Sequence, residues 1–252
     1  MLYYLFEHLD KLGIAGAGVF KYISFRASLA GILGLLLALI AGKGIIGWLQ
    51  RQQIGETIRE LGLEGQMQKK GTPTMGGIII ILSIIIPTLL LARLDNIYVI
   101  VMIISTIWMG VIGGIDDYIK VFKKDKEGMK ATTKLIGQLM LGAIIAVTID
   151  HTHSVNHLEL TTNLPITKHV LNYTLLIPGA HNAWIIYVPM IIFIVMAVTN
   201  AVNLTDGIDG LAAGTTAIVG VGLGILAYAA GNIKVSEYLN IIYVPNSGEV
   251  VI

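Results

Sequence analysis

Six long apolar runs constrain the fold of this chain more than any other feature of its sequence. A membrane-spanning helix needs about 20 mostly apolar residues, and the candidates are residues 27–49, 76–92, 97–115, 135–149, 184–202 and 211–230. Only 13% of the 252 residues are charged, against about 25% in a soluble domain. The sequence therefore predicts an all-α, polytopic membrane protein: a single integral membrane domain over residues 1–252 with six transmembrane helices.

Lysine and arginine are concentrated in the connections that follow the first and third runs. Cytoplasmic loops of membrane proteins carry an excess of these residues. We therefore expect cytoplasmic loops at about residues 50–76, 116–134 and 203–210, an outer loop at about 150–183, and the N-terminus outside. The formal net charge is only +1, so no nucleic-acid partner is expected.

A basic, glycine-rich segment, Lys-Lys-Gly-Thr-Pro-Thr-Met-Gly-Gly, occupies residues 69–77 and leads into the second run. Ammonium groups, hydroxyls and backbone N–H donors at the start of a helix suit a phosphate or pyrophosphate. The spacing is not that of a P-loop. The alternative interpretation is a basic flank with a proline turn.

A pair of acids, Asp116 and Asp117, lies at the end of the third run. Adjacent carboxylates repel, so they persist best beside a divalent cation or an ammonium group. Lys120 is three or four residues further on and can neutralise either acid on a helix. The pair could hold Mg²⁺ or accept a proton from a nucleophile, whereas the alternative is a solvated helix end.

A second acidic segment, Asn-Leu-Thr-Asp-Gly-Ile-Asp-Gly, lies at residues 203–210 between the last two runs. If this turn is helical, Asp206 and Asp209 share one face. Ionisable groups at a membrane boundary indicate a functional site, although an ordinary polar loop is the alternative. All three polar segments map to the predicted cytoplasmic face, which favours one shared site.

These three segments, in this order on alternating membrane loops, resemble the phospho-N-acetylmuramoyl-pentapeptide transferases, which belong to the polyprenyl-phosphate hexosamine-1-phosphate transferase superfamily. The resemblance covers essentially the whole chain. It implies transfer of phospho-MurNAc-pentapeptide from UDP-MurNAc-pentapeptide to undecaprenyl phosphate in the bacterial cytoplasmic membrane, giving lipid I and UMP. It also implies Mg²⁺ as cofactor and contact with membrane lipid, and it allows a homodimer.

The resemblance also implies roles for individual residues. Asp116 lies nearest the lipid phosphate, as base or as nucleophile in a two-step route, and Asp117 helps to arrange metal and phosphate. Asn203 and Asp206, the latter counted as catalytic, face the sugar-phosphate. The uridine end is formed by Lys69, Gly207, Ile208 and Asp209. Thr74, Lys120 and Lys134 are further substrate-binding candidates.

One departure from the family concerns the end of the chain. Family members have about ten transmembrane helices, and their further metal-binding Asp and a cluster of histidines belong to later loops. The present sequence ends at Ile252, where a seventh apolar run begins. We therefore expect it to be the N-terminal part of such an enzyme, and activity of this polypeptide by itself is doubtful.

Two other functions fit some of these features. A sister transferase that uses UDP-GlcNAc would keep the acidic motifs, but the Thr-Pro-Thr-Met-Gly-Gly pattern argues against it. An ion-coupled transporter would use carboxylates to bind cations, but such sites usually lie near the membrane midplane. The acids here map to one membrane face.

Overall fold

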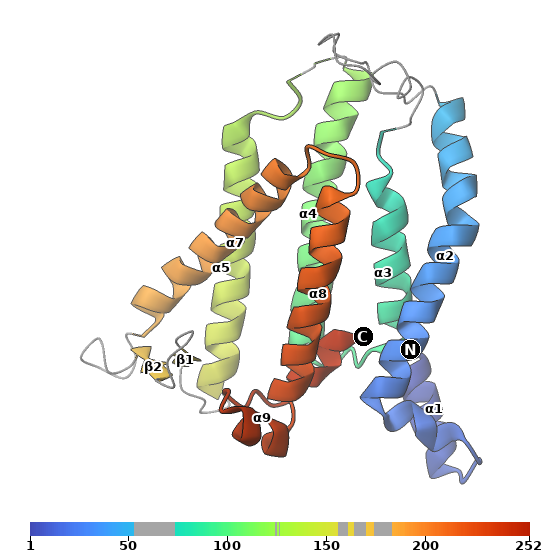
Figure 1. Ribbon diagram of the computed structural model, residues 1–252, viewed down its shortest axis with the longest axis vertical. Helices are drawn as coiled ribbons and strands as arrows, with labels where there is room; N and C mark the ends of the chain where they lie inside the picture. The colour runs from blue at the N-terminus through green and yellow to red at the C-terminus, as the bar shows by residue number, and fades with distance from the viewer. Residues whose placement is uncertain (53–73, 124, 126, 156–160, 164–169, 174–182) are drawn as a thin grey trace. The chain divides into compact units, whose positions relative to one another are not determined.

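The computed structural model describes residues 1–52, 74–123, 125, 127–155, 161–163, 170–173 and 183–252 (Figure 1). Within these residues the regular structure is helical apart from one two-stranded sheet. The chain divides into two compact units, which are described in turn.

The first unit comprises residues 1–94, 103–131 and 252. It contains α1 (Leu2–Lys11), the 3-10 helix η1 (Ala17–Lys21), α2 (Ile23–Arg51), α3 (Gly77–Leu91) and residues 103–122 of α4 (Ile97–Phe122). Helices α2 and α3 lie side by side (Figure 1). A Cβ atom at Gly34 would stand 2.8 Å from the Ser83 carbonyl oxygen. Glycine is required at this point because small residues let membrane helices approach closely.

The end of α3 is tied to α2 by a buried arginine. The guanidinium of Arg26 donates a hydrogen bond of 3.1 Å to the Leu91 carbonyl oxygen, and it lies 4.6 Å from the centre of the Tyr3 ring. Carbonyl groups in the last turn of a helix have no partner within the helix. Arg26 therefore satisfies one such group while placing its charge against an aromatic face.

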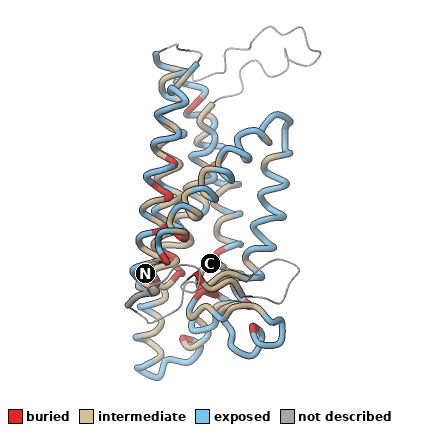
Figure 2. The backbone as a smooth tube through the Cα atoms, turned by 90° about the vertical axis from the view of Figure 1, so that its left-hand side faces the viewer, coloured by how far each residue is buried: buried red, intermediate tan, exposed pale blue. Residues whose placement is uncertain are grey.

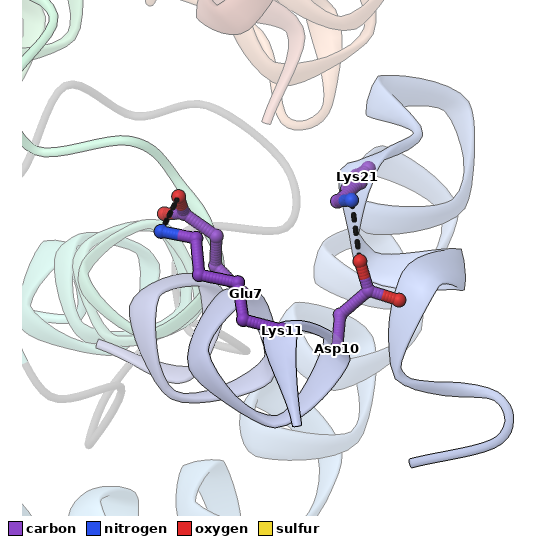
Figure 3. A network of polar contacts seen from close by, with 4 residues as sticks. All are labelled: Glu7, Asp10, Lys11 and Lys21. Carbon is purple, nitrogen blue, oxygen red and sulfur yellow. Dashed lines mark hydrogen bonds and ion pairs between the residues drawn. The ribbon is translucent and has the colours of Figure 1, made fainter. Parts of the chain in front are cut away.

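Two ion pairs lie on the short N-terminal elements, one between α1 and η1 and one within α1 (Figure 3). Lys21 pairs with Asp10, and Lys11 pairs with Glu7 at 2.9 Å. The hydrogen bond and the negative charge of Asp10 raise the pKa of Lys21 above its ordinary value. Both lysine side chains are exposed and both acidic side chains are partly exposed, so each pair contributes little to stability.

The second unit comprises residues 95–102 and 132–251. Its elements are the first residues of α4, most of α5 (Ala131–Val155), β1 (Thr161–Asn163), β2 (Val170–Asn172), α7 (Trp184–Thr205), α8 (Leu211–Ala230), α9 (Ile233–Leu239) and the 3-10 helix η3 (Ser247–Val251). The two strands are antiparallel, with Thr162 opposite Leu171. A small core of Tyr173, Ala183 and Tyr187 lies nearby.

Few helical residues are buried (Figure 2), and many large apolar side chains are exposed. In α8 none of the most hydrophobic stretch is buried, and in α7 only 6% is buried. Such surfaces are unfavourable in water, but lipid tails are as apolar as the side chains themselves. The exposed faces are therefore suited to contact with lipid or with further apolar helices.

All six predicted spans are helices, and five of them are long and apolar enough to cross a membrane. The exception is α3, with 15 residues, which at 1.5 Å per residue is about 22 Å long. The prediction of an all-α polytopic membrane protein is confirmed.

Several helix boundaries differ from the prediction. Helix α2 runs from Ile23 to Arg51, α4 extends to Phe122, and α5 extends from Ala131 to Val155. Hydropathy locates only the apolar part of each helix, and polar residues continue the backbone hydrogen bonding beyond it. Helices α1 and α9 and the two strands were not predicted, because they are too short to appear as long apolar runs.

A polar pair joins α5 and α7 within the second unit. The Asn200 amide donates a hydrogen bond of 2.8 Å to Gln138 Oε1, and Gln138 is only 7% exposed. Hydrogen bonds between membrane helices contribute about 0.6 kcal/mol on average and up to about 1.7.

We expect Gln138→Leu and Asn200→Leu each to destabilise the protein, with a coupling of about 0.6 kcal/mol between them. The measurement is a double-mutant cycle from unfolding in mixed detergent micelles. Strictly additive effects would show that this hydrogen bond does not stabilise the fold.

Candidate active site

Asp116 lies on the last turns of α4 and is buried. Only 8% of the residue is exposed, and its Oδ2 atom lies 2.7 Å from the Lys120 ammonium, one helical turn further along. The prediction that Lys120 can neutralise one of the paired acids is therefore confirmed, for Asp116. Because α4 runs to Phe122, Asp116 lies within the helix and not at a solvated helix end.

The loop after α4 folds back onto the same carboxylate. The backbone N–H of Met129 donates a hydrogen bond of 2.8 Å to Asp116 Oδ1. Asp125 shapes this loop, since its side chain accepts from the Glu127 N–H and its carbonyl from the Gly128 N–H, both at 3.1 Å. Sequence reasoning missed Gly128 and Met129. The only available signal was a glycine within a run of charged residues, which is typical of a turn.

Asp117 is intermediate in exposure, next to Asp116 on α4. Lys134 lies in the first turn of α5 and belongs to the second unit, whereas both aspartates belong to the first. Asp116 and Lys120 form an ion pair within the first unit, whereas Lys134 is part of the second unit.

The acidic segment forms the connection between α7 and α8. Asn203 lies in the last turn of α7, which ends at Thr205, and α8 begins at Leu211. Residues 206–210 between them form a non-helical turn. Asp206 and Asp209 therefore do not share a helical face.

The side chains of this turn point to the surface. Asn203, Asp206, Gly207 and Asp209 are exposed, and the apolar side chain of Ile208 is 70% exposed. The turn is closed by hydrogen bonds from the Gly207 N–H to the Thr205 carbonyl at 2.9 Å and from the Leu211 N–H to the Ile208 carbonyl at 3.1 Å. This arrangement leaves the carboxylates accessible to an aqueous ligand.

The basic segment is described only in part. Lys69 lies outside the described residues. Thr74 is described, and its hydroxyl is buried without a hydrogen-bond partner among the residues that the structure covers. Met75 adopts φ +68°, a left-handed conformation that is uncommon for a residue with a side chain. Helix α3 follows at Gly77, so this segment does lead into a helix as predicted.

Carboxylates are the side chains that Mg²⁺ prefers as ligands among the described residues. No group of three His, Cys, Asp or Glu side chains that could hold a metal ion occurs among them. Mg²⁺ is usually bound by one or two carboxylates together with substrate phosphates and water. Asp117 fits that pattern as a single carboxylate ligand next to the Asp116–Lys120 ion pair.

Comparison with known proteins places these residues in a family. The sequence pattern described as glycosyl transferase family 4 matches residues 99–245, which include both acidic motifs. The pattern described as phospho-N-acetylmuramoyl-pentapeptide-transferase signature 1 matches residues 69–81. The helices and these matches define a multi-pass membrane protein of the glycosyl transferase family 4 class.

Similarity over the whole of this chain then identifies the branch of that class. The chain is 50% identical to the phospho-N-acetylmuramoyl-pentapeptide-transferase of Flavobacterium psychrophilum, over all of this chain and 69% of that protein. It is 49% identical to that of Parabacteroides distasonis, over all of this chain and 67% of that protein. The chain belongs to the phospho-N-acetylmuramoyl-pentapeptide-transferase family.

Proposed function

We propose that this protein transfers phospho-MurNAc-pentapeptide from UDP-MurNAc-pentapeptide to undecaprenyl phosphate, releasing UMP and forming lipid I. The observation that carries the proposal is 50% identity, over the whole chain, to a relative named for this transfer. The match of signature 1 to residues 69–81 supports the same branch.

Asp116 and its neighbours supply the reacting end of the site in this proposal. The lipid phosphate attacks the β-phosphorus of the nucleotide, and UMP leaves. Transfer of a phosphoryl group depends chiefly on positioning and on neutralisation of charge. Asp116, held by Lys120, acts next to the lipid phosphate, and Lys120 adds a positive charge beside the phosphates.

The exposed turn and the basic segment bind the donor. Asn203 and Asp206 face the sugar-phosphate, and Gly207, Ile208 and Asp209 receive the uridine with Lys69. The exposure of Asn203 and of residues 206–209 supports this assignment, since a water-soluble donor must reach them. Thr74, in the basic segment before α3, and Lys134, in the first turn of α5, are the further substrate-binding residues in this proposal.

Asp117 would hold Mg²⁺ together with the substrate pyrophosphate. When bound, Mg²⁺ neutralises the charge that the phosphate oxygens carry. We place the site on the cytoplasmic face of the bacterial inner membrane, because the basic residues are concentrated in the loops that carry the motifs. A boundary site lets a lipid-soluble acceptor meet an aqueous donor.

The test is donor specificity in membranes that contain the protein expressed from its complete reading frame. We expect release of UMP and a lipid-linked product with UDP-MurNAc-pentapeptide, and neither with UDP-GlcNAc. Membranes from the same host without the gene are the control. Turnover of UDP-GlcNAc alone would identify the sister transferase, and cation uptake without UMP release would identify a transporter.

A further inference from the structure

Each oxygen of the Asp116 carboxylate is engaged by a different part of the chain. Oδ2 lies 2.7 Å from the Lys120 ammonium on α4, and Oδ1 accepts the Met129 N–H at 2.8 Å from the loop that follows. A side chain held at both oxygens has little freedom to rotate. The loop therefore decides where this carboxylate points.

The close approach of the loop depends on the lack of a side chain at Gly128. A Cβ atom there would lie 2.6 Å from Asp116 Oδ1 and 2.8 Å from Lys120 Cε. Real Cβ atoms do not come so near to other heavy atoms, so the carboxylate or the loop would have to move. Gly128 also has φ +70°, a conformation that residues with a Cβ adopt at a cost.

We propose that Gly128 is a positioning residue for the transfer reaction: its missing side chain lets the Met129 N–H hold Asp116 in its reactive orientation. The inference rests on the proposed function. It requires no contact between Gly128 and either substrate, because the effect passes through the Asp116 carboxylate. A misplacement of about 1 Å at a reacting group can reduce the rate about a hundredfold.

The experiment compares Gly128→Ala with Gly13→Ala in the protein expressed from its complete reading frame. Gly13 has a similar φ of +78° but open space around its Cβ position, so its variant carries the backbone strain without the displacement. We expect kcat of Gly128→Ala to fall about a hundredfold, with KM for the UDP donor little changed. Gly13→Ala should keep the kcat of the wild type.

A second arm separates positioning from loss of fold. Gly128→Asn introduces the same Cβ atom as Gly128→Ala. Asparagine tolerates the left-handed conformation better than alanine, so this variant stays informative if Gly128→Ala does not fold. In an Asp116→Asn background, Gly128→Ala should add no further loss to the residual rate. Residues that act as one unit are non-additive in this way.

Three results can be told apart. If the wild-type protein does not transfer the phospho-sugar, the proposed function fails. If the wild type is active and a folded Gly128→Asn keeps its kcat, the positioning role is wrong. The same conclusion follows if Gly128→Ala lowers the residual rate of Asp116→Asn by the full factor seen in the wild type.

Discussion

Asp116→Asn should reduce turnover by about 10²–10⁴-fold, the loss typical of a missing general base. Asparagine keeps the shape of the side chain and an oxygen that can accept the Met129 N–H. It removes the negative charge and the basic oxygen that faces Lys120. The measurement is lipid-linked product formed by purified, full-length protein at saturating donor and acceptor.

The variant should still fold. Asp116 is buried, but the Lys120 side chain is 43% exposed, so water can solvate its ammonium when the partner is neutral, and the loss of stability should stay below the roughly 3–5 kcal/mol of a fully buried pair. Asp10→Asn is the matched control, since it breaks the Asp10–Lys21 ion pair of the same unit (Figure 3). We expect this control to retain its rate. A near-normal rate in folded Asp116→Asn would falsify the catalytic role.

Asp209→Ala should weaken binding of the UDP donor by about ten- to over a hundredfold. A hydrogen bond to a charged group contributes roughly 1.5–3 kcal/mol, and a factor of ten corresponds to about 1.4 kcal/mol. Because Asp209 is exposed in the turn between α7 and α8, its removal leaves no cavity in the protein. The measurement is calorimetric titration of the purified variant with the UDP donor.

Asp150→Ala is the control for this binding experiment. Asp150 belongs to the same unit and lies near the end of α5, in the segment that the sequence predicts to face the outside. The donor should bind this variant as it binds the wild type. Equal affinities for the wild type and folded Asp209→Ala would remove Asp209 from the nucleotide site.

Local patterns in the sequence predicted two features of the candidate site. The Asp116–Lys120 ion pair follows from a four-residue spacing on a helix, and the structure contains it. The placement of residues 206–210 between two apolar runs also followed from hydropathy. The non-helical form of that turn did not, because glycine and aspartate permit several backbone conformations.

The sequence by itself determined the membrane-spanning helices, the order of the three polar motifs and the family, because these depend on hydrophobic runs and residue identities that can be read along the chain. Only the tertiary structure decided how the loop after α4 holds the other oxygen of Asp116. The hydrogen bond from Met129 spans 13 residues and depends on the left-handed backbone of Gly128. Such a contact has no periodic signature, since it is set by the path of the loop and by the need to satisfy buried polar groups.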